Sequence, residues 1–161
     1  MLTAEELREQ LDYDPETGVF TRRVTRANNT KVGDIAGSRN DEGYVIVKVL
    51  SHSYRAHRLA WLHVYGVWPQ NHLDHINGMR DDNRIENLRV ATHTENLRNA
   101  KKRKHTRCAL KGVNFNKGRF RAIITVASKR IHLGYYDTEE DAHAAYMAAA
   151  EKEFGAFARA E

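Results

Sequence analysis

The chain has 161 residues, of which 41% are apolar, and a formal net charge of +5 at pH 7. This length and composition predict one or two small globular domains, and the basic charge favours a polyanionic partner. The single cysteine, Cys108, excludes an internal disulfide and a cysteine-based zinc site, so we expect no structural zinc. Without an uncharged apolar run of about 18 residues or a signal-peptide pattern, we expect a cytoplasmic protein that is neither secreted nor bound to a membrane.

The first third of the chain predicts a small mixed unit of helices and strands. Thr3 and Glu6 have the spacing of a capping box, which predicts a short helix after Thr3. The segment "DYDPETGVF" predicts a turn that leads into a strand. Residues 43–50, "GYVIVKVL", are rich in β-branched side chains and predict a strand, with "YRAHR" returning antiparallel. The segment "HRLAWLHVYG" predicts a helix that ends at Gly66.

The segment "HLDHINGMRDDNRIENLRVATHTENLRNA", residues 72–100, concentrates groups that can bind a cation or accept a proton. Neighbours on a strand point to opposite sides, so one of Asp74 and His75 can hold a metal while the other faces a water molecule. Carboxylate and amide oxygens suit Mg²⁺, and a histidine of near-neutral pKa suits a general base. The end of the segment predicts a helix that brings Asn96 towards the strand. The groups in question are Asp74, His75, Asn83, Asn87, Asn96 and Asn99.

Other interpretations of this segment remain open from the residues alone. The Asn and Asp side chains could simply satisfy the turns of a polar hairpin, which is their commonest use. His72 could be a surface residue or a ligand. Arg84 and Arg98 could hold a phosphate or could pair with neighbouring acidic residues.

Residues 100–111 contain basic side chains and no acidic one. Such a run can be a solvated linker, but its neighbours on either side favour phosphate contacts by Lys101, Lys102 and Arg103. We therefore expect a basic linker at residues 104–110.

Strict alternation follows the linker. Phe120, Ala122, Ile124 and Val126 fall on one face of a predicted strand, and "KRIHLG" alternates in the same way, with Ile131 and Leu133 on the apolar side. Three short strands could thus share one apolar and one basic face. The segment "DTEEDAHAAYMAAAEKEFG" predicts a helix that Thr138 caps and Gly155 ends, and its small residues would let it sit close on the apolar face.

"LDHINGMRDDNRIENLR", followed by "VATHTENLRNA", resembles the HNH nuclease motif of phage and intron-encoded homing endonucleases, and the segments upstream resemble the N-terminal half of such phage proteins. The resemblance implies a ββα-metal fold. It implies that His75 is the general base, that Asp74 is a metal ligand, and that Asn87 holds the loop and orients the base. Asn96 takes the last position of the motif, where the plain pattern has His, and His93 is an alternative ligand one helical turn away.

Residues 111–158 resemble the DNA-binding domain of plant ethylene-response factors, the Apetala-two type, through "KG-V", "HLG-Y-DT-E-A" and the final "FG". The resemblance implies a three-stranded antiparallel sheet that packs on one helix and lies in the major groove of DNA. The plant pattern of Arg and Trp is not kept, so the plant target sequence does not carry over. The implied DNA-facing residues are Asn114, Asn116, Arg119, Arg121, Thr125, Arg130 and His132.

Together these features predict an α+β protein with three parts. A β-rich region leads into a ββα-metal nuclease motif at about 71–100 within a domain 1–103, a linker spans 104–110, and a sheet-and-helix domain spans 111–158. The predicted function is a site-specific homing-type endonuclease, dependent on Mg²⁺ or Mn²⁺, that nicks double-stranded DNA in a bacterial or phage-infected cell as a monomer or weak dimer. The alternative is a non-catalytic DNA-binding regulator, and a structure-specific or RNA nuclease is less well supported.

Overall fold

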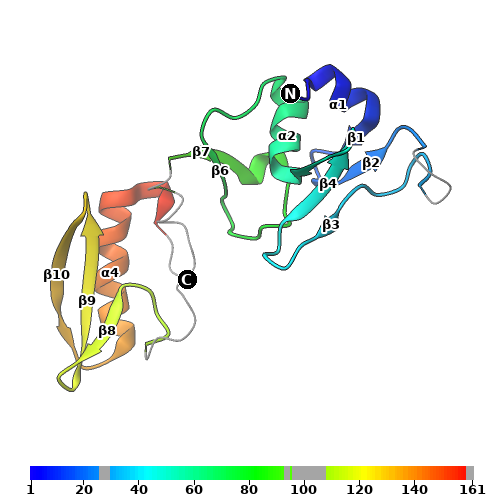
Figure 1. Cartoon of the computed structure of the whole chain (residues 1–161). Helices are drawn as coiled ribbons and strands as arrows, with labels where there is room; N and C mark the ends of the chain where they lie inside the picture. The colour runs from blue at the N-terminus through cyan, green and yellow to red at the C-terminus, as the bar shows by residue number, and fades with distance from the viewer. Residues whose placement is uncertain (26–29, 93–94, 96–107, 159–161) are drawn as a thin grey trace. The chain divides into compact units, whose positions relative to one another are not determined.

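The computed structural model describes residues 1–25, 30–92, 95 and 108–158. Two compact units, Met1–His93 and Thr94–Glu161, make up the chain (Figure 1). Both combine helices with antiparallel sheets, which confirms the predicted α+β class. Each unit has its own hydrophobic core. None of the helices in the described part of the chain has the length and apolarity that a bilayer crossing needs.

The N-terminal unit begins with helix α1 (Ala4–Gln10). The predicted capping box is present, since the backbone N–H of Glu6 donates to the Thr3 hydroxyl and the backbone N–H of Thr3 donates to the Glu6 carboxylate. Strand β1 (Leu11–Tyr13) then pairs antiparallel with β2 (Phe20–Arg22). The turn between them needs Gly18, because its φ is +72° and a Cβ there would lie 2.5 Å from the backbone nitrogen of Arg84. This hairpin therefore packs directly against residues 83 and 84.

A three-stranded sheet and a helix follow. Strands β3 (Ser38–Arg39), β4 (Val45–Val49) and β5 (His52–Arg55) are antiparallel in that order. Helix α2 (Ala56–Tyr65) starts immediately after β5 and ends at Gly66, whose φ of 76° closes the helix. The strand predicted over residues 43–50, its antiparallel partner and the helix ending at Gly66 are confirmed. The core between these elements contains Leu7, Leu11, Phe20, Val47, Val49, Leu59 and Leu62.

Two strands carry the polar segment. Strand β6 (His72–His75) pairs antiparallel with β7 (Leu88–Ala91), and a loop with a short 3₁₀ helix, η1 (Ile85–Asn87), joins them. These are the two strands of the expected ββα motif. The helix expected from "THTENLRNA" lies, apart from Thr92 and Glu95, outside the described residues.

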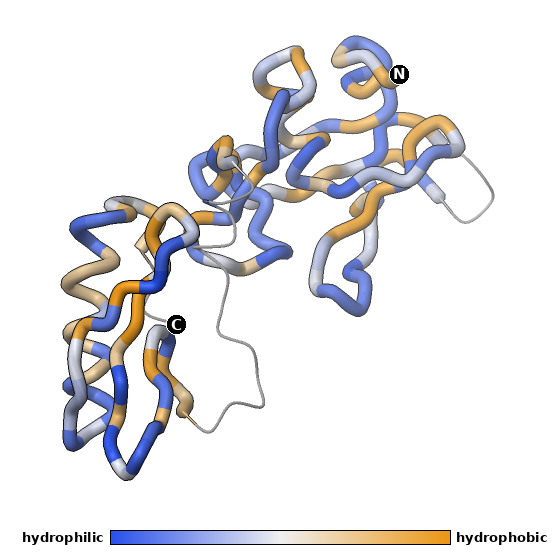
Figure 2. Tube along the Cα trace, turned by 60° about the vertical axis from the view of Figure 1, so that its left-hand side comes forward, coloured by the Kyte–Doolittle hydropathy of each residue, from blue (hydrophilic) through white to orange (hydrophobic). Residues whose placement is uncertain are grey.

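The C-terminal unit is a sheet covered by one helix, as predicted. Strands β8 (Val113–Asn116), β9 (Arg119–Val126) and β10 (Lys129–Tyr136) form an antiparallel sheet with β9 in the centre. Helix α4 (Glu139–Phe154) begins at the predicted cap, Thr138, and a 3₁₀ turn, η2 (Gly155–Phe157), follows it. The apolar and polar residues alternate along these strands (Figure 2), and the apolar face packs on Ala142, Tyr146 and Ala150 of α4.

Two details differ from a simple alternation. Ile131, expected on the covered face, is 45% exposed. It lies on the edge strand β10, which α4 covers less completely than it covers the central strand β9. The segment before β8 also contributes to the core, since Cys108 is buried against Val113, Ala122 and Ala142. Residues 104–107 of the expected linker, and Lys101, Lys102 and Arg103 before it, lie outside the described residues.

Candidate active site

His75 ends strand β6 and is almost fully buried, with 5% of its surface exposed. Its Nε2 lies 3.5 Å from Oδ1 of Asn83, at the long end of hydrogen-bond range. The amide of Asn83 is oriented by its own Nδ2, which donates to the carbonyl of Asp81 at 2.9 Å. An amide oxygen can only accept, so this contact favours the tautomer with the proton on Nε2 and the lone pair on Nδ1. This is the tautomer in which Nδ1 can accept a proton.

The surroundings of His75 favour the uncharged imidazole. Burial is the main cause that lowers its pKa below the ordinary 6.5, while the hydrogen bond to Asn83 and the negative charges of Asp74 and Asp82 act in the opposite direction. The positive charge of Arg80 lowers the pKa further. A histidine that stays neutral near pH 7 can act as a general base.

Two further rings surround His75. The His57 ring, from the first turn of α2, lies edge-on to it with centroids 5.0 Å apart, and the Tyr44 ring lies 5.5 Å from His57 and 6.1 Å from His75. His57 is buried, and its Nδ1 has no hydrogen-bond partner in the described part of the chain. Burial lowers the pKa of His57 to about 3, so this ring is neutral as well. His75 thus sits in a small cluster of rings with Tyr44, which directly precedes β4, and His57 of α2.

Asp74 contacts a different set of groups. On the neighbouring strand β7, Arg89 lies directly opposite Asp74, and its Nε and Nη2 donate to Oδ2 of Asp74 at 3.0 and 2.9 Å. Both side chains are largely buried. Asp74 and His75 therefore serve different partners, as adjacent residues of a strand do.

Asn87 holds the loop between β6 and β7. Its Oδ1 accepts from the backbone N–H of Asn77 at 3.0 Å, and its Nδ2 donates to Oδ1 of Asn77 at 3.0 Å and to the carbonyl of Asp82 at 2.8 Å. These contacts match the loop-holding part of the role that the resemblance implied. The amide that contacts the imidazole is that of Asn83, which the sequence grouped with the other polar candidates without a role of its own, because two Asn side chains in one polar loop give the same local signal.

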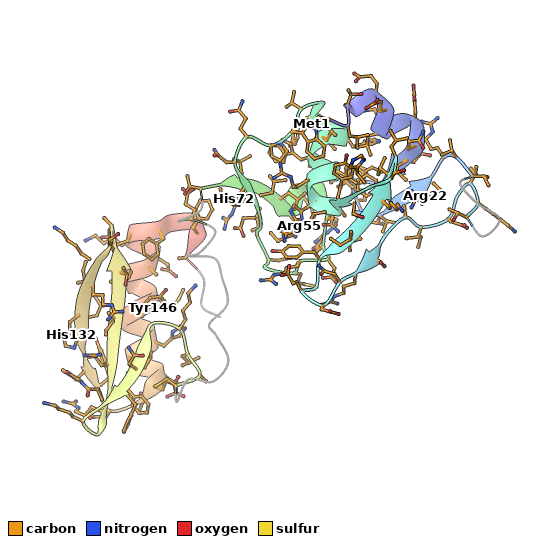
Figure 3. The ribbon with its side chains drawn as sticks, viewed as in Figure 1. Met1, Arg22, Arg55, His72, His132 and Tyr146 are labelled. Carbon is orange, nitrogen blue, oxygen red and sulfur yellow. The ribbon has the colours of Figure 1, made fainter. Side chains whose placement is uncertain are left out.

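The other candidates of this segment separate as follows. Arg84 forms ion pairs with Asp82 at 2.9 Å and with Glu86 at 2.7 Å. Of the two roles that the sequence left open for Arg84, this is pairing with neighbouring acidic residues. The ion pair and hydrogen bonds from Arg84 lower the pKa of Asp82 to about 2. His72 is exposed at the start of β6 and is labelled in Figure 3. Asn96, the second expected metal ligand, lies outside the described residues, as do His93, Arg98 and Asn99.

The donor chemistry fits a hard divalent cation. The carboxylate of Asp74 precedes His75 on strand β6, and Mg²⁺ in proteins commonly binds through one or two carboxylates while it keeps several waters. Within residues 1–25, 30–92, 95 and 108–158 there is no cluster of three or more His, Cys, Asp or Glu side chains that could hold a metal. Asp74 is the carboxylate that the resemblance assigns to such an ion, and its Oδ2 accepts the two hydrogen bonds from Arg89.

The polar face of the C-terminal sheet gathers the residues that were expected to meet DNA. The strand register places Asn114 beside Arg121, Asn116 beside Arg119, and Thr125 beside Arg130. A shallow depression of about 360 Å³ on this face is lined by Arg121, Ile123, Arg130, His132 and Tyr135. In Figure 3, His132 marks this sheet and Tyr146 marks the helix.

Tyr135 is a member of this face that the sequence did not reveal. A register shift between His132 and Gly134 reverses the alternation, so Tyr135 pairs with Arg121 and its hydroxyl lies 3.4 Å from Nδ2 of Asn116. The Nε of Arg121 is buried and has no hydrogen-bond partner among the described residues. Arg119 forms an exposed ion pair with Asp137 at 2.9 Å, which is weak in water.

The family model described as HNH endonuclease matches residues 54–98. This segment runs from strand β5 through α2 and the β6–β7 hairpin and contains His57, Asp74, His75, Asn83 and Asn87. No curated protein matches the chain. HNH nucleases are hydrolases that act on DNA and generally depend on a divalent metal. The match supports an HNH nuclease as the activity of this part of the chain.

Proposed function

We propose that the chain is a site-specific, homing-type DNA endonuclease of phage origin that depends on Mg²⁺ or Mn²⁺ and nicks double-stranded DNA. The observation that carries this proposal is the buried, neutral His75 beside Asp74 within the segment that matches HNH endonucleases. Hydrolysis would leave 5′-phosphate and 3′-hydroxyl ends. A single catalytic unit cuts one strand, so a monomer or weak dimer would act as a nickase. With bacterial or phage DNA as its substrate, it would work in the cytoplasm.

The residues of the site would divide the chemistry. The imidazole of His75 would take the proton from the attacking water, while Asn83 would orient the ring through Nε2. Asn87 would keep the loop that presents Asn83 in place. Asp74 and Asn96 would hold the metal. When bound, the divalent cation supplies stabilisation for the negative charge that develops on the phosphate and the leaving oxygen.

The C-terminal unit would supply target choice. In this proposal residues 1–103 form the nuclease domain, 104–110 a linker, and 111–158 a domain that lays its polar sheet face on DNA. Arg side chains can read guanine and Asn side chains can read adenine in the major groove. The face offers both, in Arg119, Arg121 and Arg130 and in Asn114 and Asn116, with Thr125 and His132 beside them. Lys101, Lys102 and Arg103 would contact phosphates.

One observation favours a second candidate, a DNA-binding regulator without catalysis. The carboxylate of Asp74 is held by Arg89 through two hydrogen bonds, which is also how a purely structural aspartate is used. A regulator would keep the sheet face and use the N-terminal unit only as a scaffold.

Incubation of the chain with supercoiled plasmid and Mg²⁺ separates the two. The nuclease proposal expects nicked circles with Mg²⁺ or Mn²⁺ and none in excess EDTA. Binding without nicking under all metal conditions would leave the regulator. Selection of bound and cut sites from random DNA then tests target choice: Arg119→Ala with Arg121→Ala should flatten the preference, whereas Lys152→Ala on α4 should not. Unchanged preference in the double variant would contradict the assignment of the sheet face.

A further inference from the structure

Two arginines from distant parts of the sequence meet on one tyrosine beside the candidate base. The guanidinium carbon of Arg55 lies 4.4 Å from the centroid of the Tyr44 ring, and that of Arg80 lies 4.9 Å from it. Tyr44 precedes β4, Arg55 ends β5, and Arg80 lies in the loop between β6 and β7. Figure 3 labels Arg55 within the N-terminal unit. Both distances fall within the range of a cation–π contact.

Hydrogen bonds hold this group in place. The Arg80 guanidinium donates to the carbonyl of Glu42 at 2.8 Å, and the backbone N–H of Tyr44 donates to the side chain of Asn40 at 2.9 Å. An ion pair of 3.0 Å between Arg39 and Asp81 adds a second tie between the β3–β4 turn and the loop that carries Arg80. The two guanidinium groups are therefore positioned before any ligand binds, which lowers the entropic cost of binding one.

The charges of these two arginines are not matched by buried carboxylates. Nη2 of Arg55 lies 3.5 Å from the Glu42 carboxylate, with side-chain exposures of 48% and 60%, so this pair is weak in water. Arg80 bonds to a carbonyl, which carries no net charge. By contrast, Arg84 and Arg89 each bind a carboxylate at 2.9 Å or closer. Positive charge thus stays open to solvent at Arg55 and Arg80.

This positive group lies next to the base. The Tyr44 ring that both guanidiniums contact is itself 6.1 Å from the His75 ring, centroid to centroid. A phosphate that approaches His75 would therefore meet the two arginines. Their planar, forked donors match phosphate oxygens and can bind them with two hydrogen bonds each.

We propose that Arg55 and Arg80, presented on the ring of Tyr44, bind a backbone phosphate of DNA next to the bond that His75 attacks. This assignment rests on the proposed nuclease function, which it deepens by naming the residues that hold the substrate. Both arginines are binding and positioning residues and take no proton. The competing interpretation is that they only fasten the β3–β4 turn to the loop.

The test uses the full chain and a DNA duplex that it binds, with Arg55→Gln, Arg80→Gln and the double variant. Arg23→Gln is the matched control, since Arg23 is another surface arginine of this unit in an exposed ion pair. Each lost phosphate contact should reduce the dependence of log binding constant on log salt by about one. The control should leave that slope unchanged. Salt slopes of the variants equal to that of Arg23→Gln would overturn the inference.

A second arm locates the phosphate. Single methylphosphonate groups, which lack the negative charge, are placed in turn along the strand near the cut. One position should weaken binding of the wild-type chain but not of the double variant, because the contact is already lost there. Additive effects at every position would overturn the inference.

A third arm addresses folding and the proposed function. Arg80→Lys keeps the charge and should recover most of the salt slope, a result that a purely structural fastening role does not predict. If the wild-type chain binds but never cuts, the nuclease proposal fails while the salt slopes still decide on the arginines. If it cuts and the variants keep wild-type slopes, the inference alone fails.

Discussion

Replacing Asn87 with Ala should destabilise the N-terminal unit and disorder the loop that carries Asn83. The substitution deletes three hydrogen bonds, of 3.0, 3.0 and 2.8 Å, from a buried amide. A net contribution of about 1 kcal/mol for each bond gives a loss of about 3 kcal/mol. Because Asn77 is exposed and can bind water instead, we expect about 2–3 kcal/mol rather than more. Asn87→Asp should be no better, since it turns both donations into contacts between oxygens.

Denaturant unfolding monitored by tryptophan fluorescence measures this loss. Both tryptophans of the chain, Trp61 and Trp68, lie in the N-terminal unit, so the signal reports that unit directly. Asn71→Ala, at an exposed position of the same unit, is the control. Nicking by Asn87→Ala should fall together with stability. A variant that unfolds within about 0.5 kcal/mol of the wild type, the usual range for surface substitutions, would refute the role of Asn87 in holding the loop.

Three further predictions concern pH, metal and packing. The folded pKa of His57, about 3, lies below its unfolded value near 6.5. The stability that the neutral ring contributes is therefore complete above pH 6.5 and is lost as the pH falls towards 3. The free energy of unfolding of His57→Phe should depend less on pH across that window. Asp74→Ala should need far more Mg²⁺ for nicking than the wild type, and a metal titration that superimposes on the wild-type curve would remove Asp74 from the site. Gly112→Ala should destabilise the C-terminal unit by about 1–3 kcal/mol more than Gly118→Ala in thermal unfolding. Both glycines have positive φ, but only at Gly112 would a Cβ lie 2.1 Å from the Tyr146 ring, and equal losses would refute this packing argument.

The parts of the structure that depend on local signals could be predicted from the sequence. The capping box of Thr3 and Glu6 needs only residues three apart, and the alternation in "RFRAIITV" follows from the two-residue period of a strand. The pairing of Asp74 and His75 on one strand is equally local. Each of these features depends on only a few neighbouring positions of the sequence.

The parts that depend on tertiary packing could not be predicted. Tyr44, His57 and His75 form one ring cluster, although 31 residues separate the first from the last and no periodic pattern links them. The register shift after His132 moves Tyr135 onto the polar face against the simple alternation. The choice of Asn83 as the partner of His75 depends on how the loop folds back, which the composition of the loop does not encode.

The removal of the His75 imidazole tests the central claim most directly. Nicking of plasmid DNA in Mg²⁺ is measured for His75→Ala at DNA concentrations that saturate binding, with the exposed His52→Ala as the control and DNA affinity measured in parallel. Loss of a general base predicts a rate that falls by about a hundredfold or more, with unchanged DNA affinity and a control that cuts like the wild type. A His75→Ala chain that nicks at the wild-type rate would contradict the assignment of His75 as the base.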